Sequence, residues 1–164
     1  MKAGQSFAIF PGSFDPFTNG HLDIVSRAAR IFDRLVIAVL SNPQKQTLFS
    51  CQERLDLISQ ALGDEDNTIE VMSFDGLLID FAKKLGAGVL IRGLRAVSDY
   101  EYELQMALMN RQLSGDKIET LFIVTGESNS YISSSVVKQV ASFGGDVSSL
   151  VPETVNLALK RKFS

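Results

Sequence analysis

Short apolar runs alternate along this chain with longer stretches in which apolar residues recur every three or four positions. The apolar runs lie at 7–10, 35–40, 68–72, 89–91 and 121–124. Four of these five are continuously apolar, which is typical of strands that are covered on both faces, as in a parallel sheet. The pattern therefore predicts five strands separated by connecting helices.

Three amphipathic stripes lie between these runs and predict helices. Their members are Leu22, Val25, Ala28, Ala29 and Phe32 in the first, Leu55, Ile58 and Leu62 in the second, and Leu78, Ile79, Ala82 and Leu85 in the third. Gly86 follows the third stripe as a predicted helix end.

Two further signals mark where helices begin. Ser50 with Glu53 and Ser98 with Glu101 have the S-x-x-E spacing of a capping box. Another helix is expected to follow ISSS near Ser133, and a last one to run over 152–162.

Strands that alternate with helices favour a doubly wound parallel sheet, because right-handed crossovers leave few other topologies. We predict a single α/β domain over 1–164, with a Rossmann-like five-stranded parallel sheet of order 3-2-1-4-5, helices on both faces and a C-terminal helix. Ligands bind such sheets at the carboxyl ends of the strands, where the strand order reverses. The segments after the first and fourth strands are therefore the candidates for chemistry.

Composition narrows the function. Of the 164 residues, 45% are hydrophobic and the net charge is −3, which argues against a protein that tracks nucleic acid. No apolar run approaches the length of about 20 residues that spans a bilayer, and no apolar signal core follows Met1. Cys51 is the single cysteine, so an internal disulfide is impossible. We expect a cytoplasmic protein that binds neither nucleic acid nor membrane.

The loop after the first strand, PGSFDPFTNGH at 11–21, contains two glycines, two prolines and an Asn-Gly pair. His21, the only histidine, stands where the first helix begins, and free N–H groups at such an end attract anions. The string TNGH resembles the H-x-G-H class of signature, in which glycine lets ATP approach the backbone and histidine meets its phosphates. The plain alternative is that Asn19 caps the helix and His21 is a polar neighbour.

Cations and hydroxyls follow other strands. Arg92 and Arg95 flank a glycine after the fourth strand, and their planar guanidinium groups suit phosphate oxygens. Lys45 lies in the polar loop after the second strand, and Ser133–Ser135 open a helix after the fifth. Solvated side chains and ordinary capping are the alternatives at each place. Their coincidence at one sheet edge favours a phosphorylated ligand.

The strings FPGSFDPFTNGH, SNPQK, IRGLRAVSDYEYE and ISSSVVK, in this order, resemble the bacterial phosphopantetheine adenylyltransferases, and the similarity covers nearly the whole chain. The resemblance implies that ATP and 4′-phosphopantetheine react to dephospho-coenzyme A and pyrophosphate, with Mg²⁺, in coenzyme A biosynthesis. It also points to a homohexamer. Asn129 stands where many relatives carry an aromatic residue, which leaves open how that wall of the adenine pocket is built.

The resemblance assigns site residues position by position. His21, Lys45 and Arg95 are implied to be catalytic. The residues implied to bind ATP are Ser13, Phe14, His21, Gly93, Leu94, Arg95, Glu103, Asn129, Ser130, Tyr131, Ile132, Ser133, Ser134 and Ser135. Those implied to bind the acceptor are Ser13, Lys45, Leu78 and Arg92.

The chemistry of such a reaction fits these residue types. The acceptor phosphate is already anionic, so no general base is required, and catalysis reduces to positioning and charge stabilisation. His21 would donate to the α-phosphate, while Arg95 and the serines would hold the β- and γ-phosphates. The sequence contains no evident carboxylate cluster for Mg²⁺, which is expected to ride on the triphosphate.

Other functions stay open at this point. A nucleotidyltransferase of the same scaffold could act on nicotinate mononucleotide or glycerol phosphate, and a sensing module could bind ATP without turnover. An aminoacyl-tRNA synthetase fragment shares the motif class, but the chain lacks the length and basic surface.

The helix expected at 99–113 bears on assembly. It has two apolar stripes, one with Tyr100, Leu104, Ala107 and Leu108 and the other with Tyr102, Met106, Met109 and Leu113. One stripe is enough to cover a sheet, so the second predicts a partner copy, unless the last helix covers it.

Overall fold

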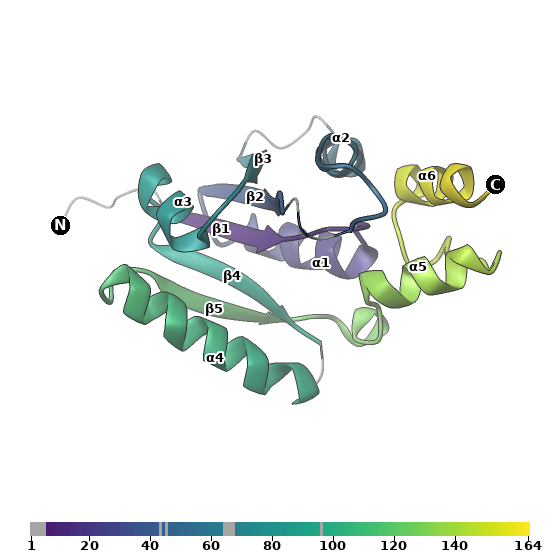
Figure 1. Ribbon diagram of the computed structural model, residues 1–164. Helices are drawn as coiled ribbons and strands as arrows, with labels where there is room; N and C mark the ends of the chain where they lie inside the picture. Colours follow the sequence, from purple (N-terminus) through teal and green to yellow (C-terminus); the bar gives the residue numbers. More distant parts are fainter. Residues whose placement is uncertain (1–5, 43, 45, 64–67, 96) are drawn as a thin grey trace.

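The computed structural model of the chain describes residues 6–42, 44, 46–63, 68–95 and 97–164 (Figure 1). Five strands are formed by these residues: β1 (Phe7–Gly12), β2 (Arg34–Leu40), β3 (Ile69–Phe74), β4 (Val89–Leu94) and β5 (Glu119–Val124). The helices are α1 (Asn19–Ala28), α2 (Cys51–Leu62), α3 (Leu78–Leu85), α4 (Val97–Ser114), the short 3₁₀ helix η1 (Glu127–Asn129), α5 (Ser134–Ser142) and α6 (Glu153–Phe163).

All neighbouring strands pair in parallel, in the order β3-β2-β1-β4-β5. The predicted fold class and strand order are therefore confirmed. The order reverses between β1 and β4, where Ala8 lies opposite Val89 and Ile9 opposite Leu90. This position is the switch point at which the carboxyl ends of the strands leave room for a ligand.

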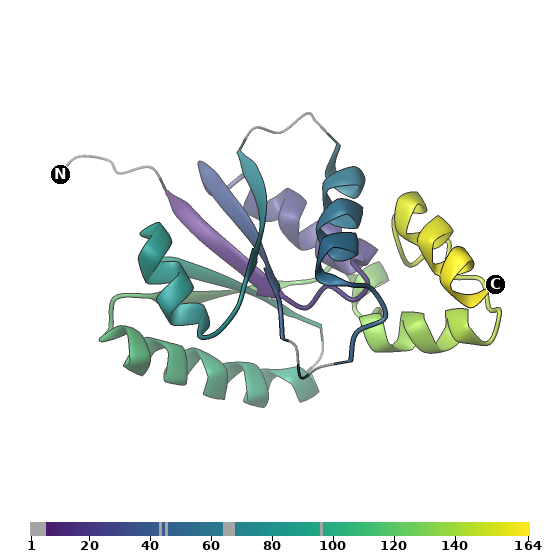
Figure 2. The ribbon, with the colours of Figure 1, turned by 45° about the horizontal axis from the view of Figure 1, so that its top comes forward.

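Two apolar clusters lie on the two faces of the sheet, because successive strand residues point to opposite sides. Ala8 and Phe10 of β1 join the cluster under α1, α2, α5 and α6, whereas Ile9 joins the cluster under α3. Figure 2 shows the two layers of helices on either side of the twisted sheet. Burial on both faces explains the continuously apolar runs of β1 and β2. It does not explain that of the edge strand β5, where Leu121 and Val124 are exposed.

Helix ends follow the local signals with one exception. Ser50 and Glu53 form the predicted capping box, and Gly86 ends α3 in the left-handed conformation with φ of 77°, which glycine adopts without strain. The expected cap at Ser98 is wrong, because α4 already begins at Val97 and Ser98 is a helical residue.

The two stripes expected on α4 are only partly right. Asn110 and Ser114 are buried and Ala107 is half-buried, whereas Tyr100 and Leu108, members of the first predicted stripe, are exposed. Buried Asn110 and Ser114 were missed because polar residues do not register in an apolar pattern. The second stripe (Tyr102, Met106, Met109 and Leu113), called the outer stripe below, is exposed, and α6 packs on α2 and α5 instead. The alternative in which the last helix covers the outer stripe is therefore wrong.

No helix in the described part of the chain is long and apolar enough to cross a membrane.

Candidate active site

A cavity of 340 Å³ opens at the carboxyl ends of β1 and β4, the predicted place for a ligand. In Figure 1 the arrows of β1 and β5 point toward the side where α5 lies. The walls of the cavity come from the loop after β1, the start of α1, the end of β4, the chain after β5 and the first turns of α5. A cavity of this size accommodates a small ligand.

The loop after β1 is held in a fixed shape by buried groups. Phe14 has a positive φ of 48°, which is unusual for a residue other than glycine, and its ring is buried against Phe10 and Phe17. Buried Arg54 of α2 donates from Nη1 to the carbonyl of Ser13 at 2.6 Å and to that of Leu40 at 3.0 Å. These contacts join the loop to the end of β2.

His21 takes part in the cap of α1. Thr18, and not Asn19, is the N-cap, and its side chain accepts from the His21 backbone N–H. The Thr18 backbone N–H donates to His21 Nδ1 at 3.0 Å. Because a backbone N–H can only donate, Nδ1 must be the unprotonated nitrogen, and the neutral ring carries its proton on Nε2. The capping geometry therefore leaves His21 with one N–H donor beside the cavity.

The surroundings also keep this ring uncharged. Phe17 stacks on His21 with centroids 5.5 Å apart, and Phe14 meets it edge-on at 5.1 Å. Burial lowers the pKa of His21 to about 4, and the positive charges of Arg95 and Arg92 contribute further. His21 is therefore a neutral hydrogen-bond donor at neutral pH.

Arg92, at the end of β4, is paired in a way the sequence did not indicate. Its Nε and Nη2 each lie 2.7 Å from a carboxylate oxygen of Glu103 on α4, and Nη1 donates to the carbonyl of Pro11 at 3.2 Å. This two-pronged contact fixes the plane of the guanidinium group. The edge formed by Nη1 and Nη2 still has N–H groups available for an anion.

The chain after β5 brings hydroxyls to the opposite wall. Ser133 caps α5 by accepting from the Val136 N–H, and Ser134 Oγ donates to the Pro16 carbonyl at 2.8 Å. Arg95 Nη1 donates to the Ile132 carbonyl at 3.4 Å. The first N–H groups of a helix such as α5 have no carbonyl partner within the helix, so this end can receive an anion.

A second cavity of 410 Å³ adjoins the first and shares Pro11, Gly12, Ser13 and Arg92 with it. Its walls are somewhat more apolar than polar. They include Leu40, Phe74, Leu78, Tyr102, Met106 and Asn110. Two ligands could therefore meet at Ser13 and Arg92.

The structure brings most of the sequence-predicted site residues to these cavities. The first is lined by Ser13, Phe14, His21, Arg92, Gly93, Arg95, Glu103, Ile132, Ser133, Ser134 and Ser135, and the second by Ser13, Leu78 and Arg92. The structure does not bring four others to either lining, namely Leu94, Asn129, Ser130 and Tyr131. Lys45 lies outside the described residues.

Two charged residues of the site were missed from the sequence. Asp15 and Lys138 line the first cavity and form an ion pair of 2.7 Å. Both residues occur in strings that carry the family resemblance, FPGSFDPFTNGH and ISSSVVK, but neither of them was assigned a role from the sequence. A buried partner 123 positions away leaves no local signal in one sequence.

In the described part of the chain, no group of three or more His, Cys, Asp or Glu side chains lies close enough together to hold a metal ion. The carboxylates that line the first cavity are Asp15 and Glu103. They are paired with Lys138 and Arg92. These residues therefore do not fit a cation held by the protein alone.

A parallel α/β sheet with a glycine-containing loop, a donor histidine and phosphate-compatible groups at its switch point defines a nucleotidyltransferase. The family model described as cytidylyltransferase-like matches residues 9–140. Curated relatives are named phosphopantetheine adenylyltransferase: the protein of Alkaliphilus metalliredigens is 55% identical over 99% of both chains, and that of Clostridium kluyveri is 54% identical over 97% of this chain and 96% of the relative. The chain belongs to the phosphopantetheine adenylyltransferase family.

Solved structures agree on the fold. A bifunctional NMN adenylyltransferase/ADP ribose pyrophosphatase from Francisella tularensis matches with a TM-score of 0.71 at 15% identity, over 96% of this chain and 49% of the other. A lipopolysaccharide core biosynthesis protein from Thermoplasma volcanium matches with a TM-score of 0.55 at 20% identity, over 76% of this chain and all of the other.

Proposed function

We infer that this chain transfers the adenylyl group of ATP to 4′-phosphopantetheine, giving dephospho-coenzyme A and pyrophosphate, a step of coenzyme A biosynthesis. The observation that carries this inference is the pair of adjoining cavities with Ser13 and Arg92 in their common wall. A transfer between two phosphorylated substrates needs such a junction, because the reacting oxygen and phosphorus must approach in line.

ATP is assigned to the first cavity. Its α-phosphate would lie at His21 and its β- and γ-phosphates at Arg95 and the start of α5. The proposed contacts are Ser13, Phe14, His21, Gly93, Leu94, Arg95, Glu103 and 129–135. Leu94 and Asn129–Tyr131 lie off the lining, so their contacts would require movement of the chain after β5 or β4.

The acceptor is assigned to the second cavity. Arg92, oriented by Glu103, would receive the acceptor phosphate, and Ser13 would contact both substrates. Leu78 would pack against the pantetheine arm. Lys45, outside the described residues, is assigned to the attacking phosphate on the resemblance of its loop alone.

The proposed reaction needs no general base, because the attacking phosphate oxygen is already anionic. That oxygen forms a bond to the α-phosphorus, and the bond to the bridging oxygen of the β-phosphate breaks, so that pyrophosphate leaves with the electron pair. His21 Nε2–H would donate to an α-phosphate oxygen as charge shifts. A neutral donor suits this step because no proton has to be transferred.

Mg²⁺ is proposed to arrive with the triphosphate and keep most of its waters. The paired state of Asp15 and Glu103 supports this arrangement over a metal held by protein carboxylates. The ion would neutralise part of the triphosphate charge.

The wall of the second cavity favours pantetheine over the rival acceptors. Leu40, Phe74, Leu78 and Met106 present apolar surface. The methyl and methylene groups of the pantetheine arm would cover it, and neither glycerol phosphate nor nicotinate mononucleotide has such an arm. A sensing module that only binds ATP would have no use for this second cavity.

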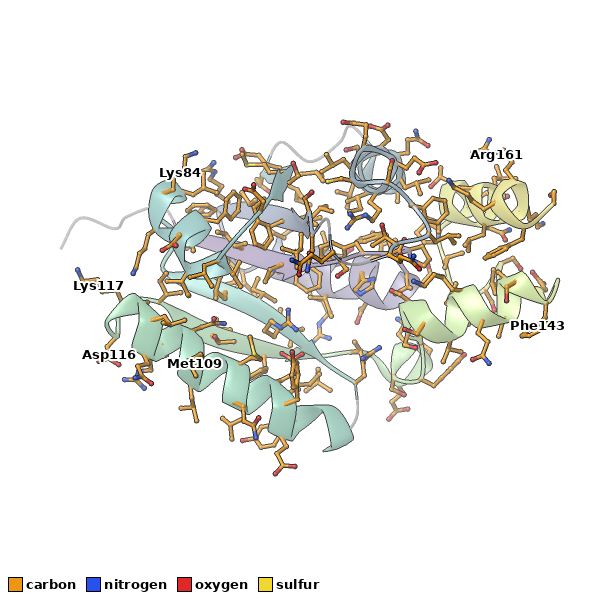
Figure 3. All side chains as sticks on the ribbon, viewed as in Figure 1. Lys84, Met109, Asp116, Lys117, Phe143 and Arg161 are labelled. Carbon is orange, nitrogen blue, oxygen red and sulfur yellow. The ribbon has the colours of Figure 1, made fainter. Side chains whose placement is uncertain are left out.

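We also propose that residues 1–164 act as one nucleotidyltransferase domain in the cytoplasm and assemble as a homohexamer. The support for assembly is an exposed apolar face on α4, with Tyr102 62%, Met106 39%, Met109 51% and Leu113 47% exposed. Figure 3 shows Met109 on α4 projecting away from the sheet. Leu121 and Val124 of β5 are exposed as well.

The direct experiment incubates the protein with ATP, Mg²⁺ and, in separate reactions, 4′-phosphopantetheine, nicotinate mononucleotide and glycerol phosphate. We expect pyrophosphate release with 4′-phosphopantetheine only, and a product of the mass of dephospho-coenzyme A. Release with another acceptor would reassign the substrate, and ATP binding without release in any reaction would favour the sensing module.

A further inference from the structure

Asp15 is a buried carboxylate that connects its own loop to two other segments of the chain. Asp15 is 4% exposed. Oδ1 accepts from the Phe49 N–H at 2.9 Å, and Oδ2 accepts from the Leu48 N–H at 3.0 Å and from Lys138 Nζ at 2.7 Å. Every one of these donors lies at least 33 positions away from Asp15 in the sequence.

The three segments carry different parts of the proposed site. Asp15 belongs to the loop with Ser13 and Phe14. Leu48 and Phe49 lead from the loop after β2 into α2. Lys138 stands one turn into α5, whose first residues form the serine wall of the ATP cavity. A second contact also connects α5 to the loop after β1, because Ser134 Oγ donates to the Pro16 carbonyl at 2.8 Å.

We propose that Asp15 is a positioning residue, which through Lys138 sets the distance between the α5 wall of the ATP cavity and the loop that leads to the acceptor. The inference rests on the proposed function. It assigns Asp15 and Lys138 no contact with substrate. Their role is to keep the α-phosphate and the attacking phosphate in line.

The electrostatics of Asp15 agree with this role. Burial alone would raise the pKa of the Asp15 carboxyl, but the hydrogen bonds from Lys138, Phe49 and Leu48 outweigh it and hold the pKa below its usual value. Asp15 is thus ionised at neutral pH. A buried negative charge is costly without partners, so the loss of Lys138 is expected to disturb the surroundings of Asp15.

The chain offers a matched control for Lys138. Lys162 of α6 pairs with Glu53 of α2 at 2.9 Å, and its side chain is 36% exposed against 31% for Lys138. This pair joins two helices, whereas Asp15 lies in a loop, and neither Lys162 nor Glu53 lines the two site cavities. The carboxylates differ, since the Asp15 side chain is 5% exposed and that of Glu53 is 44% exposed. Lys138→Met and Lys162→Met therefore each remove a lysine of similar exposure from an ion pair, at different places.

The first arm of the test measures kcat and the KM of each substrate for Asp15→Asn, Lys138→Met and the double variant, with Lys162→Met as control. We expect kcat to fall about tenfold to a hundredfold in either single variant, as for a misplacement of about 1 Å, with the KM for ATP nearly unchanged. The double variant should fall no further than the worse single one, since both act through one contact. Lys162→Met should keep the kcat of the unaltered protein.

Other outcomes would overturn the proposal. A raised KM for ATP in Lys138→Met, with normal kcat in Asp15→Asn, would mean that Lys138 binds the triphosphate directly. Losses that add in the double variant, or an equal loss in Lys162→Met, would mean independent or merely stabilising roles.

A second arm needs no turnover. Amide hydrogen exchange at Leu48 and Phe49 should be faster in Lys138→Met than in the unaltered protein, because the effect passes through Asp15 to the α2 entry. Lys162→Met is no control for this arm, since Lys162 Nζ lies over the Phe49 ring at 5.5 Å. Unchanged exchange there would refute the coupling. Pyrophosphate release by the unaltered protein tests the proposed function separately, so the two failures are distinguishable.

Discussion

His21 has its protonation state set by its neighbours. The Thr18 N–H occupies Nδ1, and the two phenylalanine rings and nearby arginines disfavour a charged ring. We predict that the free protein shows a histidine titration with a midpoint near pH 4, so the ring gains its proton only as the pH falls well below 6.5. The ¹H–¹³C signal of the single histidine measures it directly. A midpoint near 6.5 would contradict the described environment.

Removal of the His21 ring should slow the chemical step more than it weakens substrate binding. By analogy with the loss of one oxyanion donor, His21→Ala should reduce kcat on the order of a hundredfold to a thousandfold, or roughly 3 to 4 kcal/mol. It should also cost about 1 kcal/mol of stability, because the Thr18 N–H loses its capping partner. Single-turnover rates and thermal unfolding check the two effects.

His21→Gln serves as the comparison, since a glutamine at this position can still complete the capping box. It should recover the stability and part of the rate, if its amide reaches the same oxygen. Near-normal turnover by folded His21→Ala would reduce the histidine to a capping residue.

Arg92 and Glu103 should be tested together, because each is the other's partner. Arg92→Ala should weaken the binding of the phosphorylated acceptor by roughly tenfold to a hundredfold, which is the contribution of a charged hydrogen bond. The binding of ATP should be weakened less. Glu103→Gln keeps the shape and should give a smaller loss of the same kind. Calorimetric titration with each substrate separates the effects. An equal rise in both dissociation constants would show that the division between the two cavities is wrong.

At the scale of elements, the exposed stripe of α4 provides the test of assembly. Met109 is half-exposed in the single chain. In an interface, the carboxylate of Met109→Glu would be buried without a partner, which is costly. We predict that the unaltered protein sediments as a hexamer at micromolar concentration and that Met109→Glu yields smaller species.

Gln112→Glu is the matched control, since Gln112 is exposed on the same helix and off the apolar stripe; it should stay hexameric. A monomer in the unaltered protein would remove the proposal.

The elements show which parts of the fold were predictable from the sequence. Buried strands, the Ser50–Glu53 capping box and the Gly86 helix end are local patterns, and all were predicted. The inner face of α4 was not, because buried Asn110 and Ser114 are polar and exposed Leu108 is apolar. Tertiary contacts decide such positions, and periodicity alone does not contain them.

For the whole molecule, the predicted strand order is confirmed, and a candidate cavity lies at the carboxyl ends of β1 and β4, where that order predicts a ligand. Pairings across the site did not follow. The Arg92–Glu103 and Asp15–Lys138 pairs join residues from different elements, and a single sequence does not state which cation meets which carboxylate. The resemblance supplied residue names but not these partners.

The central claim is that an acceptor phosphate attacks the α-phosphorus of ATP across the wall shared by the two cavities. The most direct measurement follows ATP labelled at the α-phosphate in a single turnover with 4′-phosphopantetheine. We predict that the label appears in dephospho-coenzyme A at the rate at which unlabelled pyrophosphate is released, with no labelled protein. Label found in free AMP, in the protein, or in unreacted ATP alone would contradict the account.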